Sequence, residues 1–232
     1  MRILLVGHGK MNRAVERLAR ERGHVVVGVI EAAQNAGGGG ITAATAAGAD
    51  VAVEFTRPEV AAGNLLRLAE LGVPTVTGTT GWLGELPLVR PAVERAGSAL
   101  LHSANFSIGV QLFFRAAQEL ARRFAGRAEF GGFVTETHHA AKLDAPSGTA
   151  LRLVDWLAEG DPARTWPITS IRGGHVPGTH AVVLDAAFEQ VRLVHEARSR
   201  EVFAAGALAA AEWLPGRRGV FTFDQMLFGE GP

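Results

Sequence analysis

The first half of the chain alternates short β-branched runs with helical patterns, and this alternation constrains the fold more than any other feature. Between the runs, apolar residues recur at helical spacing, as Val15, Leu18 and Ala19 do after Met11. One run, Val25–Ile30, is continuously apolar, which is typical of a strand buried on both faces of a parallel sheet. Strand, helix, strand in this order predicts a doubly wound α/β layer. The predicted strands are 2–6, 25–30, 51–55, 73–77 and 99–101, with helices after residue 11 and around 60–71 and 88–96, and a glycine loop at 37–40.

The second half of the chain changes rhythm after Asn105. A helix is predicted at 110–124, a strand at 129–137 and a further helix at 145–157. Three strand-like runs follow, at 165–171, 180–188 and 190–195, with no helix between them. We therefore expect an α+β arrangement with an open, mixed and mostly antiparallel sheet. A last helix at 202–213 and a short strand at 220–223 are predicted to return to the first layer.

Composition excludes several classes of protein. The 232 residues contain no cysteine, which rules out disulfides, thiol catalysis and cysteine-ligated metals. The formal charge is +0, and no basic run is interleaved with aromatics, so we expect no nucleic-acid partner. No apolar run approaches the roughly 20 residues of a membrane helix, and the start "MRILLVGHGK" indicates a strand rather than a secretory signal. These features predict a cytoplasmic protein without a membrane partner.

The stretch "VGHGKMN" follows the first predicted strand and opens a helix. Gly7 and Gly9 match the first two glycines of a G-x-G-x-x-G turn, while Asn12 stands at the third position. Glu31 closes the second strand, 19 residues after Asn12, where a carboxylate would accept hydrogen bonds from the ribose hydroxyls of an adenosine. Glycines after a strand can also serve a turn alone, but the placement of Glu31 favours a dinucleotide.

The choice between NADH and NADPH depends on the same segment. Glu31 would repel a 2′-phosphate, and Ala32 stands where an arginine would suit NADP. Lys10, in the turn, could reach such a phosphate or only the pyrophosphate. We therefore expect NADH to be favoured and NADPH to be tolerated.

Three further loops follow predicted strands at their carboxyl ends, where open α/β sheets bind ligands. They are "FTRP" (55–58), "GTTG" (78–81) and "SANFS" (103–107), although glycine and threonine also make ordinary turns. The side chains of His8 and Trp82 are expected to pack in loops. The predicted cofactor contacts are Gly7, His8, Gly9, Lys10, Met11, Asn12, Glu31, Thr56, Gly78, Thr79, Thr80, Ser103, Ala104, Asn105 and Phe106.

The stretch "ETHHAAKLDAPSGTA", residues 136–150, carries the candidate chemistry. Lys142 is one of only two lysines, and an ammonium can give up a proton where an arginine cannot, although a bias toward arginine could also explain the count. The adjacent His138 and His139 suggest a metal fragment, but no cysteine or close carboxylate pair completes a site, so no metal is expected. Asp144, ahead of Pro146, is interpreted as a helix cap.

This stretch closely resembles the signature of the 4-hydroxy-tetrahydrodipicolinate reductase (dihydrodipicolinate reductase) family of the diaminopimelate route to lysine. The resemblance covers essentially the whole chain: the glycine turn, Glu31, "FTRP", "GTTG", "NFSIGV", "RGGHVPGTH", "HEARSREVFAAGAL" and "FDQML". The signature is specific because it combines His-His-x-x-Lys with a Pro-Ser-Gly-Thr helix start. Asn12 departs from the usual third glycine, which leaves the packing of that helix on its strand open.

The resemblance implies an NAD(P)H-dependent reduction of a small cyclic dicarboxylate by a homotetramer. It implies that His138 is the proton donor or acceptor, a role suited to an imidazole near neutral pH. It also implies that Lys142 is a partner proton donor and that His139 contacts the substrate. Ser147, Gly148 and Thr149 would offer donors to an anion at a helix start. Four residues in matching segments are expected to line the substrate pocket without assigned roles: Arg172, His175, His180 and Arg200.

We therefore predict two domains. A Rossmann-type dinucleotide-binding domain comprises residues 1–108 and 200–232, and an α+β substrate-binding and oligomerisation domain comprises residues 109–199. Two alternatives remain: another two-domain amino- or imino-acid dehydrogenase, such as one acting on aspartate, and a nicotinamide-nucleotide sensor without turnover.

Overall fold

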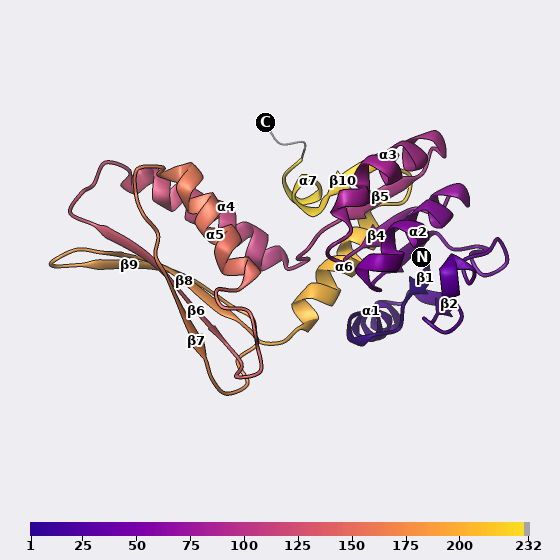
Figure 1. The fold of residues 1–232 in the computed structure, drawn as a ribbon, viewed down its shortest axis with the longest axis horizontal. Coiled ribbons are helices and arrows are strands. Elements are labelled where there is room, and N and C mark those ends of the chain that lie inside the picture. Colours follow the sequence, from indigo (N-terminus) through magenta and orange to yellow (C-terminus); the bar gives the residue numbers. More distant parts are fainter. Residues whose placement is uncertain (230–232) are drawn as a thin grey trace. The chain divides into compact units, whose positions relative to one another are not determined.

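The computed structural model describes residues 1–229 and divides the chain into two compact units (Figure 1). The first unit combines Met1–Ser107 with the chain from Glu201 onward, and the second is the continuous segment Ile108–Arg200. Of the predicted domain segment 200–232, residues 230–232 lie outside the described part.

Sheet A, in the first unit, is a six-stranded parallel sheet. Its order is β10-β5-β4-β3-β1-β2, so the direction of winding reverses between β1 and β3. The parallel doubly wound layer predicted from the alternating pattern is confirmed. The strands are β1 (Arg2–Val6), β2 (Val25–Ile30), β3 (Val51–Glu54), β4 (Thr75–Thr77), β5 (Ala99–His102) and β10 (Gly219–Thr222).

Helices cover both faces of sheet A because successive strand side chains point to opposite faces. Ile3 and Leu5 pack into a buried cluster with α1 and α6, whereas Leu4 and Val6 pack on the opposite face with Leu68 of α2. The helices of this unit are α1 (Lys10–Glu21), α2 (Pro58–Glu70), α3 (Leu86–Arg95), α6 (Glu201–Trp213) and α7 (Phe223–Phe228), with short 3-10 turns at Ala36–Gly38 and Leu83–Glu85.

Two features of the first unit differ from the sequence-based prediction. β2 is an edge strand with only β1 beside it, so its apolar run is half-buried, and Val25 is 58% exposed. The expectation of burial on both faces was therefore wrong. The short helix α7 was not predicted; Thr222 caps it, and Gln225 completes a capping box.

Sheet B, in the second unit, has the order β7-β6-β8-β9 and is mixed. β6 runs parallel to β7 and antiparallel to β8, and β8 and β9 form an antiparallel hairpin. The open, mostly antiparallel sheet predicted from the sequence is confirmed. The strands are β6 (Gly131–His138), β7 (Ile168–Arg172), β8 (Thr179–Asp185) and β9 (Gln190–Glu196), and the helices are α4 (Ile108–Phe124) and α5 (Gly148–Gly160).

One face of sheet B carries the core of the second unit. Val134 and Val182 pack on it with Phe114 of α4 and Leu153 of α5. β8 ends at Asp185 rather than 188, because a tight turn at 186–189 closes the hairpin and leaves Phe188 fully exposed. Across the described residues of both units, no helix is long and apolar enough to cross a membrane.

Candidate active site

The turn after β1 has the geometry of a phosphate-binding turn. Gly7 has a φ of +85°, and a Cβ there would lie 2.2 Å from the carbonyl oxygen of Phe55, so only glycine fits. Gly9 is the N-cap of α1, and the first backbone N–H groups of a helix have no intrahelical partners. A pyrophosphate at this turn would meet those donors and the positive end of the helix dipole.

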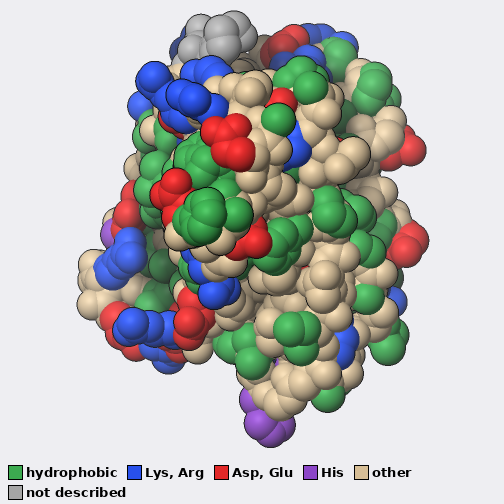
Figure 2. Space-filling view, turned by 90° about the vertical axis from the view of Figure 1, so that its left-hand side faces the viewer, with side chains coloured by type: hydrophobic (Ala, Val, Ile, Leu, Met, Phe, Trp, Pro, Cys, Tyr) green, Lys and Arg blue, Asp and Glu red, His purple; other side chains and the backbone are tan. Residues whose placement is uncertain are grey.

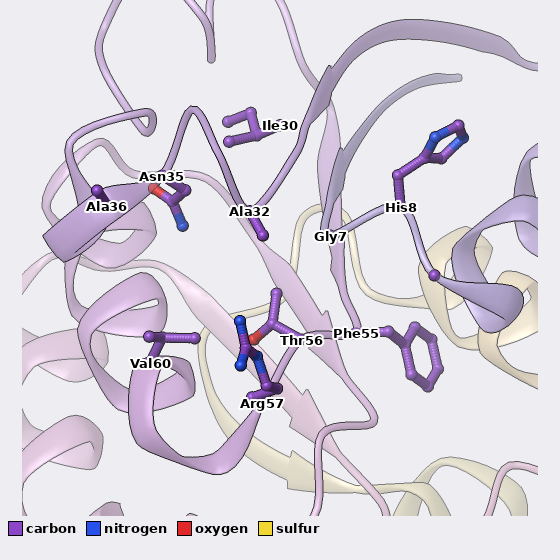
Figure 3. Close-up of a pocket in the computed structure, with 11 residues that line it drawn as sticks. Gly7, His8, Ile30, Ala32, Asn35, Ala36, Phe55, Thr56, Arg57 and Val60 are labelled. Atoms are coloured by element: carbon purple, nitrogen blue, oxygen red, sulfur yellow. The ribbon is translucent and has the colours of Figure 1, made fainter.

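A cavity of about 380 Å³ opens beside this turn (Figure 3). It lies where sheet A reverses its winding, the position at which open α/β sheets bind ligands. Figure 3 shows Asn35 and Ala36 on one side of the cavity, with Val60 and the Arg57 side chain on the opposite side. Small and aliphatic side chains with a few polar groups suit the adenosine half of a dinucleotide. The lining comprises Gly7, His8, Gly9, Ile30, Ala32, Asn35, Ala36, Phe55, Thr56, Arg57 and Val60.

The structure brings the predicted cofactor contacts to one edge of sheet A, but not all to this cavity. Four of them line it: Gly7, His8, Gly9 and Thr56. Three form the first turn of α1: Lys10, Met11 and Asn12. Seven lie beyond the carboxyl ends of β4 and β5, outside the lining just given: Gly78, Thr79, Thr80, Ser103, Ala104, Asn105 and Phe106.

Asn12 compensates for the missing third glycine. Its side chain is fully buried, and Nδ2 donates to the carbonyl oxygens of Val6 (2.9 Å), Gly7 (2.8 Å) and Val53 (3.2 Å). One amide therefore ties the start of α1 to the ends of β1 and β3. The helix packs on its strands through these hydrogen bonds.

Glu31 follows β2 directly, and 59% of its side chain is exposed. The imidazole of His8 lies between two carboxylates: Nδ1 is 3.3 Å from Oε1 of Glu31, and Nε2 is 2.8 Å from Oε2 of Glu16. His8 thus fixes the acid that would meet the adenosine ribose. Lys10 is exposed at the start of α1.

Glu54, at the end of β3, is a functional candidate that the sequence reasoning missed. Its carboxylate is fully buried and accepts hydrogen bonds from the hydroxyls of Thr56, Thr77 (2.5 Å) and Thr79 (2.9 Å). Thr56 and Thr79 stand in the loops after β3 and β4, so this carboxylate fixes both loops relative to each other. An acid at the last position of an otherwise apolar strand was the available signal.

In the second unit, β6 ends at the predicted proton donor. His138 is buried, and its Nδ1 lies 3.1 Å from Oε2 of Glu136. A Cβ at Gly178 would lie 3.0 Å from His138 Nε2, so the glycine keeps the space around that nitrogen clear. Burial lowers the pKa of His138, and the Glu136 carboxylate opposes that shift.

Glu136 is held by donors from two other elements. Its Oε1 accepts hydrogen bonds from the backbone N–H of Ser147 (3.0 Å), the hydroxyl of Ser170 (2.7 Å) and Nη2 of Arg172 (2.7 Å). Burial alone would raise the pKa of Glu136, but the nearby Ser147 hydroxyl together with these hydrogen bonds outweighs it and lowers the pKa to about 2. The group is a carboxylate at any working pH.

Lys142 lies in the loop after β6, and its ammonium donates to both carboxylate oxygens of Asp144, at 2.7 and 2.9 Å. The hydrogen bond from Lys142 lowers the pKa of Asp144. Asp144 is not the N-cap of α5, although its carboxylate also interacts with the backbone N–H of Gly148, the first residue of that helix. The N-cap of α5 is Ser147, whose hydroxyl accepts from the backbone N–H of Ala150 (3.1 Å), and α5 begins at Gly148 rather than at 145. Gly148 and Thr149 form its first turn.

His139 points to a different surface of the same loop. Its Nε2 lies 3.0 Å from Nη2 of Arg200, and both residues line a cavity of about 370 Å³. The lining also includes His175, so two of the four residues expected near the substrate without a role meet here. The other two, Arg172 and His180, lie instead in the buried cluster around Glu136.

The buried cluster is not suited to a metal ion. Glu136, His138 and His180 could offer three ligand atoms within 4.8 Å of one another. However, the guanidinium of Arg172 already binds the same carboxylate, and a second cation there would be repelled. Burial lowers the pKa of His180 to about 4, which leaves its imidazole neutral in a hydrogen-bonded cluster.

A parallel sheet with a glycine turn at its switch point, together with a separate unit that carries a buried imidazole site, defines a class of proteins: the two-domain, dinucleotide-binding oxidoreductases. The chain belongs, within this class, to the dihydrodipicolinate reductase family. The model of the family's N-terminal part matches residues 1–106, and that of its C-terminal part matches residues 109–227.

Relatives along the full length agree with this assignment. The chain is 33% identical, over 98% of both sequences, to a 4-hydroxy-tetrahydrodipicolinate reductase from Christiangramia forsetii. It is 34% identical to one from Staphylococcus carnosus, over 97% of this chain and 99% of that protein. Among solved structures, a dipicolinate-bound dihydrodipicolinate reductase from Paenisporosarcina shares the fold, with a TM-score of 0.77, 19% identity and coverage of 96% of this chain and 97% of that one.

The fold alone does not separate the family from other dehydrogenases. An aspartate dehydrogenase from Thermotoga maritima gives a TM-score of 0.51 at 10% identity, over 91% of this chain and 95% of that one. The choice between them depends on the side chains of the second unit.

Proposed function

We propose that the protein reduces 4-hydroxy-tetrahydrodipicolinate to tetrahydrodipicolinate with NAD(P)H, in the diaminopimelate route to lysine. The observation that carries the proposal is the arrangement of His138, Lys142 and the capped N-terminus of α5 in one unit of a chain that belongs to this reductase family. The proposed substrate is a dianion, and the half-buried ammonium of Lys142 with a helix N-terminus is suited to bind it.

In the proposed reaction the nicotinamide supplies the hydride, and the second unit supplies binding and protons. His138 exchanges a proton through Nε2, the nitrogen that Gly178 leaves clear. Lys142 leaves Asp144, binds a substrate carboxylate and acts as the partner proton donor. The backbone N–H groups of Gly148 and Thr149 hold the other carboxylate. His139 pairs with Arg200 on a different surface of the loop, so its proposed contact with the ring requires this loop to move.

NADH is the proposed favoured cofactor. The exposed carboxylate of Glu31 would accept from both ribose hydroxyls and would repel a 2′-phosphate. Ala32, in the cavity lining, offers such a phosphate no counter-charge, whereas Arg57 and Lys10 leave NADPH usable. We expect kcat/KM to be higher with NADH, and Glu31→Ala to reduce that preference. An unchanged ratio in the variant would show that selection lies elsewhere.

The proposed homotetramer forms through the face of sheet B opposite α4 and α5. Ile171 and Val194 are 51% and 50% exposed on this sheet, and in Figure 2, which views the side on which its strands lie, hydrophobic side chains are dispersed among polar ones. β7 and β9 are the edge strands of this open sheet, and unpaired edges are commonly covered by a partner. Light scattering on the wild type and on Val194→Glu tests this, because a tetramer should dissociate in the variant and a monomeric wild type would refute it.

The function is tested by NADH oxidation with substrate generated in situ by the preceding synthase from pyruvate and aspartate semialdehyde. The wild type should oxidise NADH, and His138→Ala and Lys142→Ala should lose at least about a hundredfold in kcat. Both variants should still bind NADH. His24→Ala, a histidine between α1 and β2, is the matched control.

Two outcomes would favour the alternatives. Oxidation or reduction with aspartate, but not with the synthase product, would indicate an amino-acid dehydrogenase of the same fold. Tight NADH binding by a folded wild type that turns over neither substrate would indicate a sensor.

A further inference from the structure

Glu136 is a buried acid in the cluster around His138, and the proposed reaction gives it no role. It stands two residues before His138 on β6, so both side chains point to the same face of sheet B. The carboxylate is fully buried. A buried charge is costly unless other groups compensate it, so its surroundings show what it does.

One oxygen of Glu136 is fixed from two directions. Oε1 accepts from Ser147, at the start of α5, and from Ser170 and Arg172 on β7. These three donors leave the carboxylate little freedom to rotate. Ser147 also caps α5, so its hydrogen bond to Glu136 fixes the start of the helix that is proposed to bind the substrate.

The other oxygen of Glu136 faces the imidazole. Oε2 and His138 Nδ1 are 3.1 Å apart, and neither atom has a hydrogen-bond partner of good geometry among the described residues. His180 contacts the edge of the His138 ring, and its Nε2 lies 3.8 Å from the same oxygen. Each of the two atoms is buried, so a proton on Nδ1 shared with Oε2 satisfies both.

We propose that Glu136 is a positioning residue that holds His138 in the tautomer with its proton on Nδ1, so that Nε2 is the nitrogen that exchanges a proton with the substrate. This inference rests on the proposed role of His138. Gly178 supports it independently, because its missing side chain leaves Nε2 as the accessible nitrogen. Glu136 thereby couples the proton donor to the substrate-binding end of α5.

The same arrangement determines how the titration of His138 responds to a change at Glu136. Burial lowers the pKa of His138, and Glu136 is the nearest negative charge that raises it. Removing that charge should lower the pKa of His138 further, and the basic limb of the pH–rate profile should move to lower pH. The other groups that face this imidazole are His180, Arg172, Lys142 and Asp144.

Glu136→Gln tests the proposal because an amide has nearly the same shape. Its carbonyl oxygen can keep the bonds to Ser147, Ser170 and Arg172, while its NH₂ group would donate to Nδ1 and force the proton of neutral His138 onto Nε2. We expect kcat to fall by about ten- to a hundredfold with less than about a threefold change in KM. Glu136→Asp should recover part of the loss, and Glu159→Gln, an exposed acid of α5, is the matched control.

Nitrogen-15 NMR of the imidazoles reports which nitrogen of His138 carries the proton. A purely structural role of Glu136 would leave that tautomer unchanged in the variant. The wild type should show His138 protonated on Nδ1 at high pH, and Glu136→Gln should show it protonated on Nε2. A wild type with the Nε2-protonated tautomer would overturn the proposal without any variant. A variant that keeps the wild-type tautomer and pH profile would also overturn it. An inactive wild type with the expected tautomers would contradict the proposed function and leave the positioning of His138 established.

Discussion

Replacing Asn12 with alanine should destabilise the first unit at the glycine turn. The amide has two N–H hydrogens and three carbonyl oxygens within 3.2 Å, so two full hydrogen bonds are lost. The carbonyl oxygen of Val6 also accepts a hydrogen bond from the backbone N–H of Phe55, so loss of its bond to Asn12 costs about 0.5–1.5 kcal/mol. The carbonyl oxygen of Gly7 would be buried without a donor, which costs about 1–3 kcal/mol. Alanine recovers roughly 0.5 kcal/mol of helix propensity.

The expected net loss in free energy of unfolding is therefore about 1–4 kcal/mol. Urea unfolding followed by far-UV circular dichroism measures it, and hydrogen exchange at the β1 amides localises it to this unit. Arg20→Ala, an exposed position on the same helix, should stay within about 0.5 kcal/mol of the wild type. NADH affinity should also fall in Asn12→Ala, because the turn that meets the pyrophosphate loosens. A variant as stable as the wild type would refute the role assigned to the amide.

Three further predictions concern other positions. Gly206→Ala should lower the free energy of unfolding by about 3 kcal/mol, because a Cβ there would lie 1.7 Å from the carbonyl oxygen of Phe106; an unchanged melting temperature would contradict this. Asp144→Asn should lower the substrate KM by up to about fivefold with kcat unchanged, since the exposed carboxylate competes for Lys142; a raised KM would instead assign Asp144 to binding. The wild type should be more stable than Glu136→Gln, because folding lowers the pKa of Glu136. This difference in stability should be fully present above the ordinary pKa of 4.5 and should be lost as pH falls toward about 2. Acid unfolding of both proteins measures it, and a difference that does not change with pH would contradict the assignment.

Much of the fold could be predicted because its signals are local. Alternating apolar runs and helical spacing give the order of elements, and Gly7 with Glu31 marks the dinucleotide end of sheet A. The edge position of Val25–Ile30 could not be predicted, because a continuous apolar run looks the same in a central strand. Which strands flank it depends on pairing between distant segments.

The candidate site was predictable where one residue type carries the chemistry, as at His138 and Lys142. It was not predictable where a side chain acts through a distant partner. Asp144 resembles a cap in sequence, yet it pairs with Lys142, because Ser147 is three residues closer to the helix and supplies the hydroxyl. Glu54 and Glu136 were missed because their donors come from segments that only the tertiary fold brings together.

The second unit interrupts the first in the sequence, so part of the first unit is synthesised after the second. α6 supplies Ala204, Ala207 and Leu208 to the cluster that covers one face of sheet A, and β10 completes that sheet beside β5. Both follow Ile108–Arg200 in the chain, so they emerge from the ribosome after that segment. Until then, only α1 covers this face of the five N-terminal strands, and the part that α6 will cover stays exposed. The dinucleotide-binding unit can therefore close only after the segment inserted within it has emerged and has had time to fold.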